Sequence, residues 1–163
     1  MKETLTTIEK ALFLKDLTFF EHIPIEQAAA VAHIAHEVHF EAGSVILQQG
    51  DPAEYVFLPI EGNTILERDG IVLNVLGAGE GFGDLSLVPG ALYALSARAA
   101  THLHVLRLHV DDLADTMLEH PEVAVGVVRA LSNRLRELTQ QMADLNRQLQ
   151  DGSHAYRLPE SQG

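Results

Sequence analysis

Hydrophobic and polar positions divide the 163-residue chain into a helical beginning, a β-rich middle and a helical end. Apolar residues recur at helical spacing between Thr7 and Phe20, which predicts a first helix. Pro24 followed by Glu26 is a typical helix start, so we expect a second helix that continues to about His36.

After Gly43 the pattern changes to short β-rich runs, separated by turn signals at regular intervals, which predicts an antiparallel roll or barrel. Asp69-Gly70 is the strongest hairpin signal, because a type I′ turn needs positive φ at its centre. Pro59 lies in an otherwise good strand and predicts an edge or a bulge. The expected strands lie in Val45–Leu47, Tyr55–Leu58, Thr64–Leu66, Ile71–Leu73, Tyr93–Ala99 and Leu103–Leu108.

The pattern becomes helical again from Asp111, and Pro121 marks the start of a long terminal helix. We expect Asp151-Gly152-Ser153 to break that helix. The expected organisation is one domain over residues 1–150, made of N-terminal helices (1–37), a β-roll (38–110) and C-terminal helices (111–150), with a flexible tail after it (151–163).

Apolar residues of the terminal helix follow one another at alternating spacings of four and three, which is the a/d seam of a coiled coil. Up to about Leu131, packing of the helix on its own barrel explains the stripe. Beyond it the roll is too small to cover the helix, so we expect a parallel homodimer through residues 131–149. The expected interface is Leu131, Leu135, Leu138, Met142, Leu145 and Leu149.

Composition narrows the class of protein. A hydrophobic content of 47% is enough to fill one core, and no window is long and apolar enough to span a membrane. The first residues fit neither a secretory signal nor a transit peptide, so we expect a cytoplasmic protein without direct membrane insertion. The net charge of −12 opposes direct binding of nucleic acid, and the absence of cysteine excludes disulfides and thiolate chemistry.

A glycine-rich stretch from Gly79 to Ala99 carries the most specific chemistry. Glycines allow backbone N–H groups to approach an anion, and a following helix N-terminus adds a favourable dipole. The alternative is that these glycines only make a tight turn. The stretch does not complete the G-x-G-x-x-G fingerprint, so we drop a dinucleotide-binding fold.

This stretch resembles the phosphate-binding cassette of cyclic-nucleotide-binding domains, which reads roughly F-G-E-L-A-L-L, a short linker, and P-R-S-A-T-V-R-A. Phe82 and Gly83 match, Asp84 replaces the glutamate, and Tyr93 stands where the family has arginine. Further points of resemblance over about residues 8–138 are Ile8–Lys15, Phe40–Gly43, Gly50–Ala53, Glu61-Gly62 and His120–Ala124.

The resemblance implies a mainly β fold with flanking helices: an antiparallel eight-stranded β-roll (a double-stranded β-helix or jelly roll), N-terminal helices, a short cassette helix and a long C-terminal helix. It also implies a ligand, either a cyclic nucleotide (cyclic AMP or cyclic GMP) or another small molecule. The implied ligand-binding residues are Gly81, Phe82, Gly83, Asp84, Leu85, Ser86, Tyr93, Ala94 and Ser96.

Two cassette positions change the expected chemistry. By resemblance Asp84 would accept a hydrogen bond from the ribose 2′-hydroxyl, although a helix-capping role explains it equally well. Tyr93 offers a neutral O–H where guanidinium would supply a permanent charge and two donors, so we expect weakened phosphate binding. Arg98 does not replace it, because strand alternation turns Arg98 to the opposite face.

Nine histidines raise the question of a metal site. His33 and His36 share a face if both are helical, and His102 and His104 share a face of a strand. The H-x-H spacing is similar to cupin metal sites, but Val105-Leu106-Arg107-Leu108 follows without the carboxylate that such sites need, so we expect no metal site. No nucleophile elbow or distinctive carboxylate pair appears either, so we expect no enzyme.

The sequence therefore favours a ligand-sensing regulatory module that signals through its dimerising C-terminal helix. The resemblance is to sensor domains without a DNA-binding helix-turn-helix, because the chain stops at Gly163 with no such element after the helix. The alternative is a non-binding structural or interaction module whose pocket Tyr93 and Leu95 fill. Its partner would be an effector protein, since Ile8–Lys15 resembles cyclic-nucleotide-like domains appended to membrane transporters.

Overall fold

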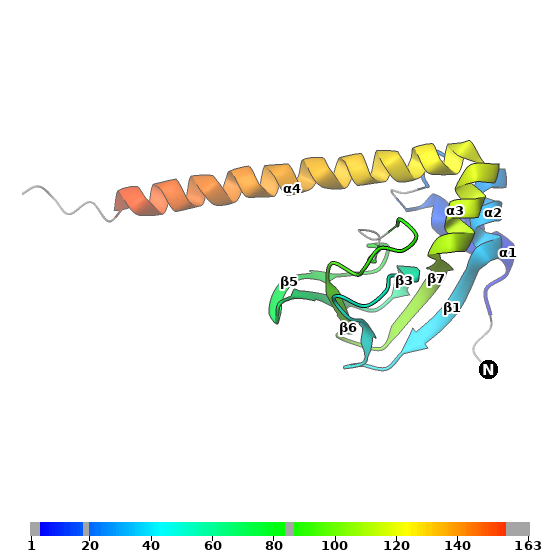
Figure 1. The fold of residues 1–163 in the computed structure, drawn as a ribbon, viewed down its shortest axis with the longest axis horizontal. Coiled ribbons are helices and arrows are strands. Elements are labelled where there is room, and N and C mark those ends of the chain that lie inside the picture. Colours follow the sequence, from blue (N-terminus) through cyan, green and yellow to red (C-terminus); the bar gives the residue numbers. More distant parts are fainter. Residues whose placement is uncertain (1–3, 18–19, 84–86, 156–163) are drawn as a thin grey trace, which may run out of the picture. The chain divides into compact units, whose positions relative to one another are not determined.

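The computed structural model describes residues 4–17, 20–83 and 87–155, and side chains up to Gly152. The chain divides into two compact units, residues 1–127 and residues 128–163. Strands β1 to β7 and helices α1, α2 and α3 belong to the first unit, and Figure 1 labels most of them. The strands are β1 (Ala35–Phe40), β2 (Val45–Leu47), β3 (Tyr55–Glu61), β4 (Thr64–Arg68), β5 (Ile71–Leu76), β6 (Ser96–Ala99) and β7 (Leu103–His109).

Two antiparallel sheets build the roll, one in the order β1-β7-β3 and the other in the order β2-β6-β4-β5. Side chains from both sheets meet in one core, where burial of apolar surface stabilises the fold. The expected antiparallel roll with flanking helices and a long C-terminal helix is confirmed. The described residues contain seven strands rather than eight, and residues 84–86 of the expected cassette helix lie outside them.

Both local strand signals are confirmed. Asp69 (φ 51°) and Gly70 (φ 78°) form the turn between β4 and β5, where Arg68 pairs with Ile71. Pro59 lies in β3, an edge strand of its sheet, at a register shift against β7.

The helices are α1 (Thr7–Lys15), α2 (Ile25–Ile34), α3 (Val110–Glu119) and α4 (Pro121–Ala155). The expected continuation of the first helix to Phe20 is wrong, because the chain turns at Asp16, whose N–H donates to the carbonyl of Phe13 at 3.1 Å. The expected end of the terminal helix at Asp151–Ser153 is also wrong, since one glycine costs only about 1 kcal/mol within a helix.

Strand β1 differs from the sequence pattern, which predicts a second helix that continues to about His36. That helix ends at Ile34, so the expectation is wrong and His33 and His36 do not share a helical face. β1 pairs with β7 from Ala35↔Leu108 to Phe40↔Leu103. This pairing is a tertiary effect that outweighs the local helical pattern.

Candidate functional site

The cassette glycines lie against strand β3. Phe82 exchanges two backbone hydrogen bonds with Phe57, at 2.9 and 3.0 Å, and the two rings stack with their centroids 5.1 Å apart. Gly81 and Phe82 are buried. The first part of the cassette is therefore fixed to the wall of the roll through Phe57.

Gly83 makes the closest approach of the cassette to β3. Its φ is +81°, and a Cβ added there would lie 2.8 Å from the carbonyl oxygen of Tyr55. Glycine is required at this position because both the dihedral angle and the contact exclude a side chain. Asp84, Leu85 and Ser86 follow directly and lie outside the described residues.

Tyr93 reaches the same place from the other end of the cassette. Its side chain is only 8% exposed and belongs to the core between the sheets. The hydroxyl donates to the carbonyl of Tyr55 at 2.9 Å and accepts from the N–H of Tyr55 at 3.0 Å. Burial raises the pKa of the Tyr93 phenol, so it stays neutral at physiological pH.

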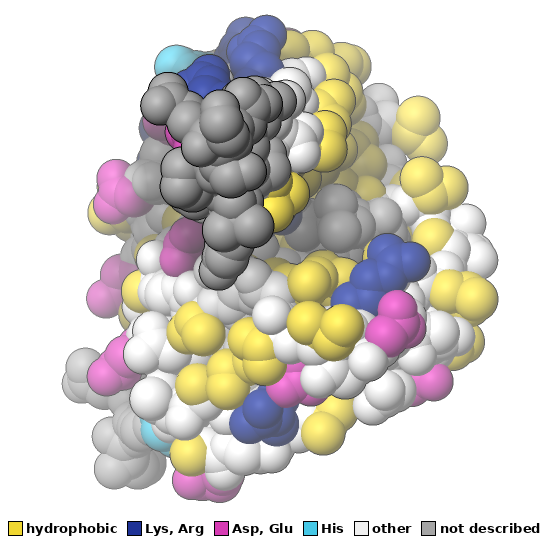
Figure 2. All heavy atoms as spheres, turned by 90° about the vertical axis from the view of Figure 1, so that its left-hand side faces the viewer, with side chains coloured by type: hydrophobic (Ala, Val, Ile, Leu, Met, Phe, Trp, Pro, Cys, Tyr) yellow, Lys and Arg dark blue, Asp and Glu magenta, His cyan; other side chains and the backbone are white. Residues whose placement is uncertain are grey.

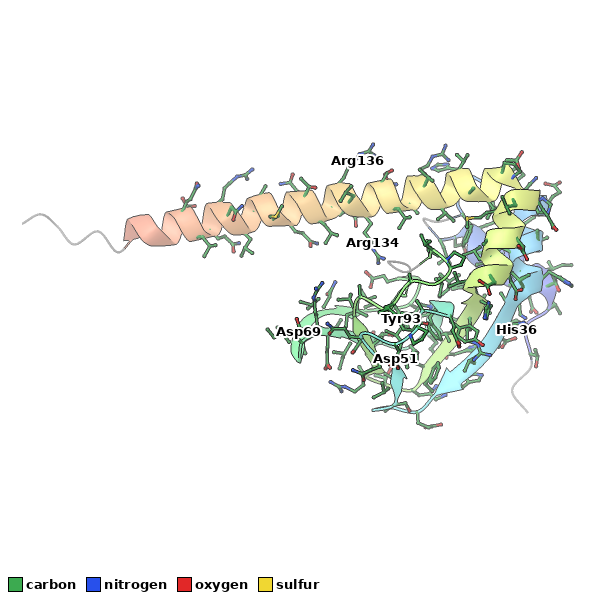
Figure 3. The ribbon with its side chains drawn as sticks, in the orientation of Figure 1. His36, Asp51, Asp69, Tyr93, Arg134 and Arg136 are labelled. Carbon is green, nitrogen blue, oxygen red and sulfur yellow. The ribbon has the colours of Figure 1, made fainter. Side chains whose placement is uncertain are left out.

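The backbone around Tyr93 continues this pairing outside the regular strands. Tyr93 N–H donates to the carbonyl of Asp51, and its own carbonyl accepts from Gly50, each at 2.9 Å. Figure 3 shows Tyr93 within the roll near Asp51. The expected strand over Tyr93–Ala99 is thus regular only over Ser96–Ala99, because residues 91–93 pair with the loop after β2.

The cassette therefore contacts Tyr55 and Phe57 through three residues, Phe82, Gly83 and Tyr93. Ala94, which follows Tyr93 in the chain, is half-buried. The groups that make these contacts are aromatic rings, a phenol hydroxyl and backbone atoms, and none of them is charged. A phenol whose hydroxyl already donates and accepts has little capacity left for a phosphate oxygen.

Gly79 also has its N–H engaged, since it donates to the carbonyl of Pro59 at 2.8 Å. This hydrogen bond and the positive φ of Gly79 are consistent with the tight-turn role of the glycine. The turn positions the chain for the pairing of Phe82 with Phe57.

Ser96 does not join this group. Alternation along β6 turns Ala97 and Ala99 into the core and leaves Ser96 and Arg98 half-exposed on the other face. The Ser96 hydroxyl accepts from Gln48 Nε2 at 3.2 Å and from the Gln49 N–H at 2.9 Å. The structure thus separates Ser96 from Tyr93.

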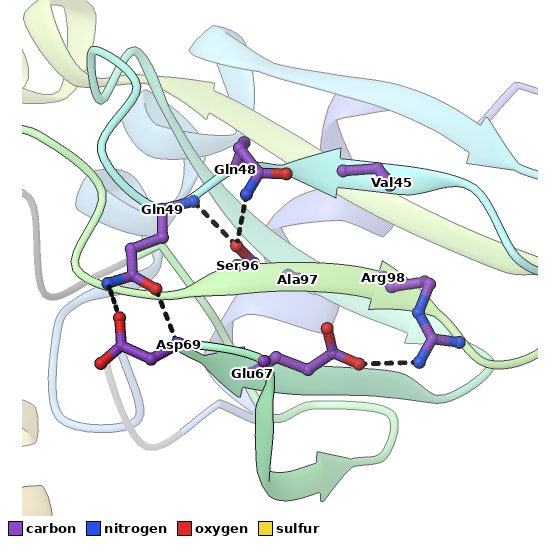
Figure 4. Close-up of a pocket in the computed structure, with 9 residues that line it drawn as sticks. Val45, Gln48, Gln49, Glu67, Asp69, Ser96, Ala97 and Arg98 are labelled. Atoms are coloured by element: carbon purple, nitrogen blue, oxygen red, sulfur yellow. Dashed lines mark hydrogen bonds and ion pairs between the residues drawn. The ribbon is translucent and has the colours of Figure 1, made fainter.

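Ser96 and Arg98 line a partly open hollow of about 280 Å³ (Figure 4). Arg98 pairs with Glu67 at 2.7 Å, and Gln49 exchanges two hydrogen bonds of 3.0 Å with Asp69. Polar side chains of this hollow are therefore already paired with one another, and Arg98 points away from Tyr93 as expected.

Arg107 is a candidate that sequence reasoning missed. It lies on β7 opposite Phe57, and its guanidinium carbon is 4.3 Å from the centre of the Tyr55 ring. Its Nε is buried and has no hydrogen-bond partner among the described residues. The alternation Leu103, Val105, Arg107 could have placed it on the inner face, beside the Tyr55 to which Tyr93 is anchored.

The terminal helix α4 carries the predicted stripe. Leu131 is half-buried, and the other expected interface residues are between 52% and 66% exposed. Figure 2, which looks along this helix, shows hydrophobic side chains gathered on one of its sides. The exposed residues are Leu135, Leu138, Met142, Leu145 and Leu149.

Among the described residues, no helix has the length and apolar character needed to cross a bilayer.

Known proteins share both the sequence pattern and the fold. A CRP-like cAMP-activated global transcriptional regulator of Mycobacterium tuberculosis is 26% identical over 131 residues, which are 77% of this chain and 58% of that protein. This chain thus spans little more than half the length of that regulator.

Two solved structures are similar as well. The N-terminal domain of a transcriptional regulator from Streptomyces coelicolor A3(2) is 30% identical, with a TM-score of 0.67 over 80% of this chain and 94% of that one. The catabolite activator protein of Thermus thermophilus is 26% identical, with a TM-score of 0.68 over 79% of this chain and 63% of that one. The sequence profile described as "Cyclic nucleotide-binding domain" matches residues 37–120, about half of the chain. The chain belongs to the cyclic nucleotide-binding domain family.

Proposed function

We propose that this chain is a cytoplasmic, non-catalytic regulatory module that senses a small ligand in its β-roll and signals through a dimerising C-terminal helix. The observation that carries the proposal is the occurrence of a long exposed a/d seam on α4 in a chain of this family. A seam of large apolar residues is costly to leave in water, and pairing with an identical helix would bury it.

The proposed ligand is a cyclic nucleotide, cyclic AMP or cyclic GMP, or another small molecule of similar size. The name of the mycobacterial relative, a cAMP-activated regulator, supports this choice. The cassette itself supplies a neutral phenol at Tyr93, and Arg107, which lies over the ring of the same Tyr55 that binds this phenol, is our candidate cation for an anionic ligand. We therefore expect weaker cyclic-nucleotide binding than an arginine-bearing cassette would give.

One observation favours a second candidate, a structural or interaction module that binds no ligand. The Tyr93 hydroxyl is bonded to both the N–H and the carbonyl of Tyr55, so the side chain that would meet a ligand is instead part of the core. In this case the exposed seam would serve only dimerisation or docking of an effector protein.

A thermal-shift screen separates the two candidates. A ligand at about 100 times its dissociation constant stabilises the folded state by roughly 2.7 kcal/mol, which is readily measured. Cyclic AMP, cyclic GMP, adenosine and guanosine form a matched set, since the nucleosides lack the phosphate. Stabilisation by the cyclic nucleotides supports the sensing module. No shift with any of the four at millimolar concentration supports the structural module.

A further inference from the structure

Two histidines and a glutamate come together on the outer face of the sheet formed by β1 and β7. Val38, Phe40 and Val105 pack into the core of the roll, so the alternating positions Glu37 and His39 face outward. His104 lies directly opposite His39 in the register of the two antiparallel strands, which run side by side in Figure 1. The carboxylate that was missing after His104 in the sequence is thus provided by β1.

The three side chains are close enough to share one ion. One ligand atom from each of Glu37, His39 and His104 lies within 4.8 Å of the other two. His104 Nε2 and Glu37 Oε2 are 2.9 Å apart. Metal bonds of about 2.0–2.2 Å to nitrogen and oxygen place two ligands of one ion about 3–4 Å apart, so small side-chain rotations close the site.

The carboxylate is held in place by a second contact. The backbone N–H of Leu5 donates to Glu37 Oε1 at 2.6 Å, which leaves Oε2 directed at His104. Hydrogen bonds of this kind orient ligands in metal sites and raise affinity. The same bond ties the segment before α1 to strand β1, so an ion at Glu37 would connect the N-terminal segment to both strands.

His39 contributes the exposed side of the cluster. It stacks on His104 with ring centroids 4.2 Å apart and on His102 at 5.4 Å. His39 is exposed whereas Glu37 and His104 are half-buried, so a bound ion would have two ligands in the sheet and one at its solvent side. Water would complete the coordination there.

We propose that Glu37, His39 and His104 form a binding site for a divalent transition-metal ion, with Zn²⁺ as the best match. Two imidazole nitrogens and one carboxylate are a ligand set that Zn²⁺ takes in proteins. Hard ions such as Mg²⁺ and Ca²⁺ prefer oxygen ligands, so they fit this set poorly. The site is independent of the ligand proposed inside the roll, because it lies on the other face of the sheet.

Calorimetric titration of the untagged full chain with Zn²⁺ tests the proposal. We expect one ion per chain, and His39→Ala and Glu37→Gln should each weaken binding by at least about tenfold. Glutamine keeps an oxygen that can accept from Leu5, so Glu37→Gln removes the charge with little effect on the fold. The matched control is His33→Ala, because His33 is exposed on α2 outside the cluster, and it should bind Zn²⁺ as the unmodified chain does.

The site would be overturned if His39→Ala bound Zn²⁺ as tightly as the unmodified chain. It would also be overturned if His33→Ala lost as much affinity for Zn²⁺ as His39→Ala. Imidazole proton resonances of the unmodified chain give a second test that requires no variant. Zn²⁺ at one equivalent should shift the resonances of His39 and His104 and leave those of His33 in place. A uniform shift of all histidines, or none, would contradict the proposal.

Discussion

At the level of single residues, the cassette depends on how closely Gly83 approaches Tyr55. We expect Gly83→Ala to lower the free energy of unfolding by about 2 kcal/mol or more, because the new methyl meets the Tyr55 carbonyl at positive φ. Gly90→Ala is the matched control: its φ is +84° but a Cβ there meets nothing within 4 Å, so it should cost only about 1 kcal/mol. Urea denaturation measures both, and equal losses would show that the contact is unimportant.

Tyr93 makes the stability of the fold sensitive to high pH. Burial raises the pKa of its phenol above the unfolded value of about 10. The stability that comes from the neutral phenol is therefore fully present below pH 10 and is lost as the pH rises through the folded-state pKa. Between pH 9 and 11, the free energy of unfolding should fall more steeply for the unmodified chain than for Tyr93→Phe.

At neutral pH the same variant should lose about 1–3 kcal/mol, because the Tyr55 N–H loses its partner in a partly buried position. If the free energy of unfolding changed with pH in the same way in both proteins between pH 9 and 11, the role assigned to the hydroxyl would be contradicted.

At the level of elements, the seam of α4 is the feature that pairing should depend on. Leu135→Glu with Leu138→Glu should convert a dimer into a monomer, because burying unpaired carboxylates is costly. Asn133→Glu with Gln140→Glu adds the same charge at positions remote from the seam and should leave the dimer intact. Light scattering at tens of micromolar gives the mass. A monomeric unmodified chain, or a dimer that survives the leucine substitutions, would refute pairing through the seam.

The elements were predictable where one local signal decides the conformation. Asp69-Gly70 and Pro59 determine a turn and an edge position by their own backbone preferences, and both are found. Strand β1 was missed because its pairing partner lies more than sixty residues away in β7. Local pattern reading does not contain that information.

In the candidate site too, local pattern predicts some features, whereas tertiary contacts decide others. Alternation along β6 predicts that Arg98 faces away from Tyr93, and the same rule applies to Ser96, which lies on the face of Arg98. The anchoring of Tyr93 on Tyr55 and the grouping of Glu37 with His104 depend on tertiary contacts. Residue types and spacing along the chain do not report such contacts.

At the level of the whole molecule, the net charge restricts which macromolecules the protein can bind. With a net charge of −12, the chain should not retain duplex DNA, because it has no excess of cations to replace the counterions of the phosphates. A gel shift at sub-micromolar protein and low salt should show free DNA only. A salt-sensitive complex would mean that a local basic surface outweighs the net charge.

We infer that the chain keeps the architecture of its family while Tyr93 removes the cassette's anion chemistry. Calorimetric titration of the unmodified chain and of Tyr93→Arg with cyclic AMP and cyclic GMP tests it most directly. We predict weak binding by the unmodified chain and at least about tenfold tighter binding by Tyr93→Arg, because a bidentate, charge-assisted contact is restored. Tight binding by the unmodified chain that Tyr93→Arg does not improve would contradict the claim.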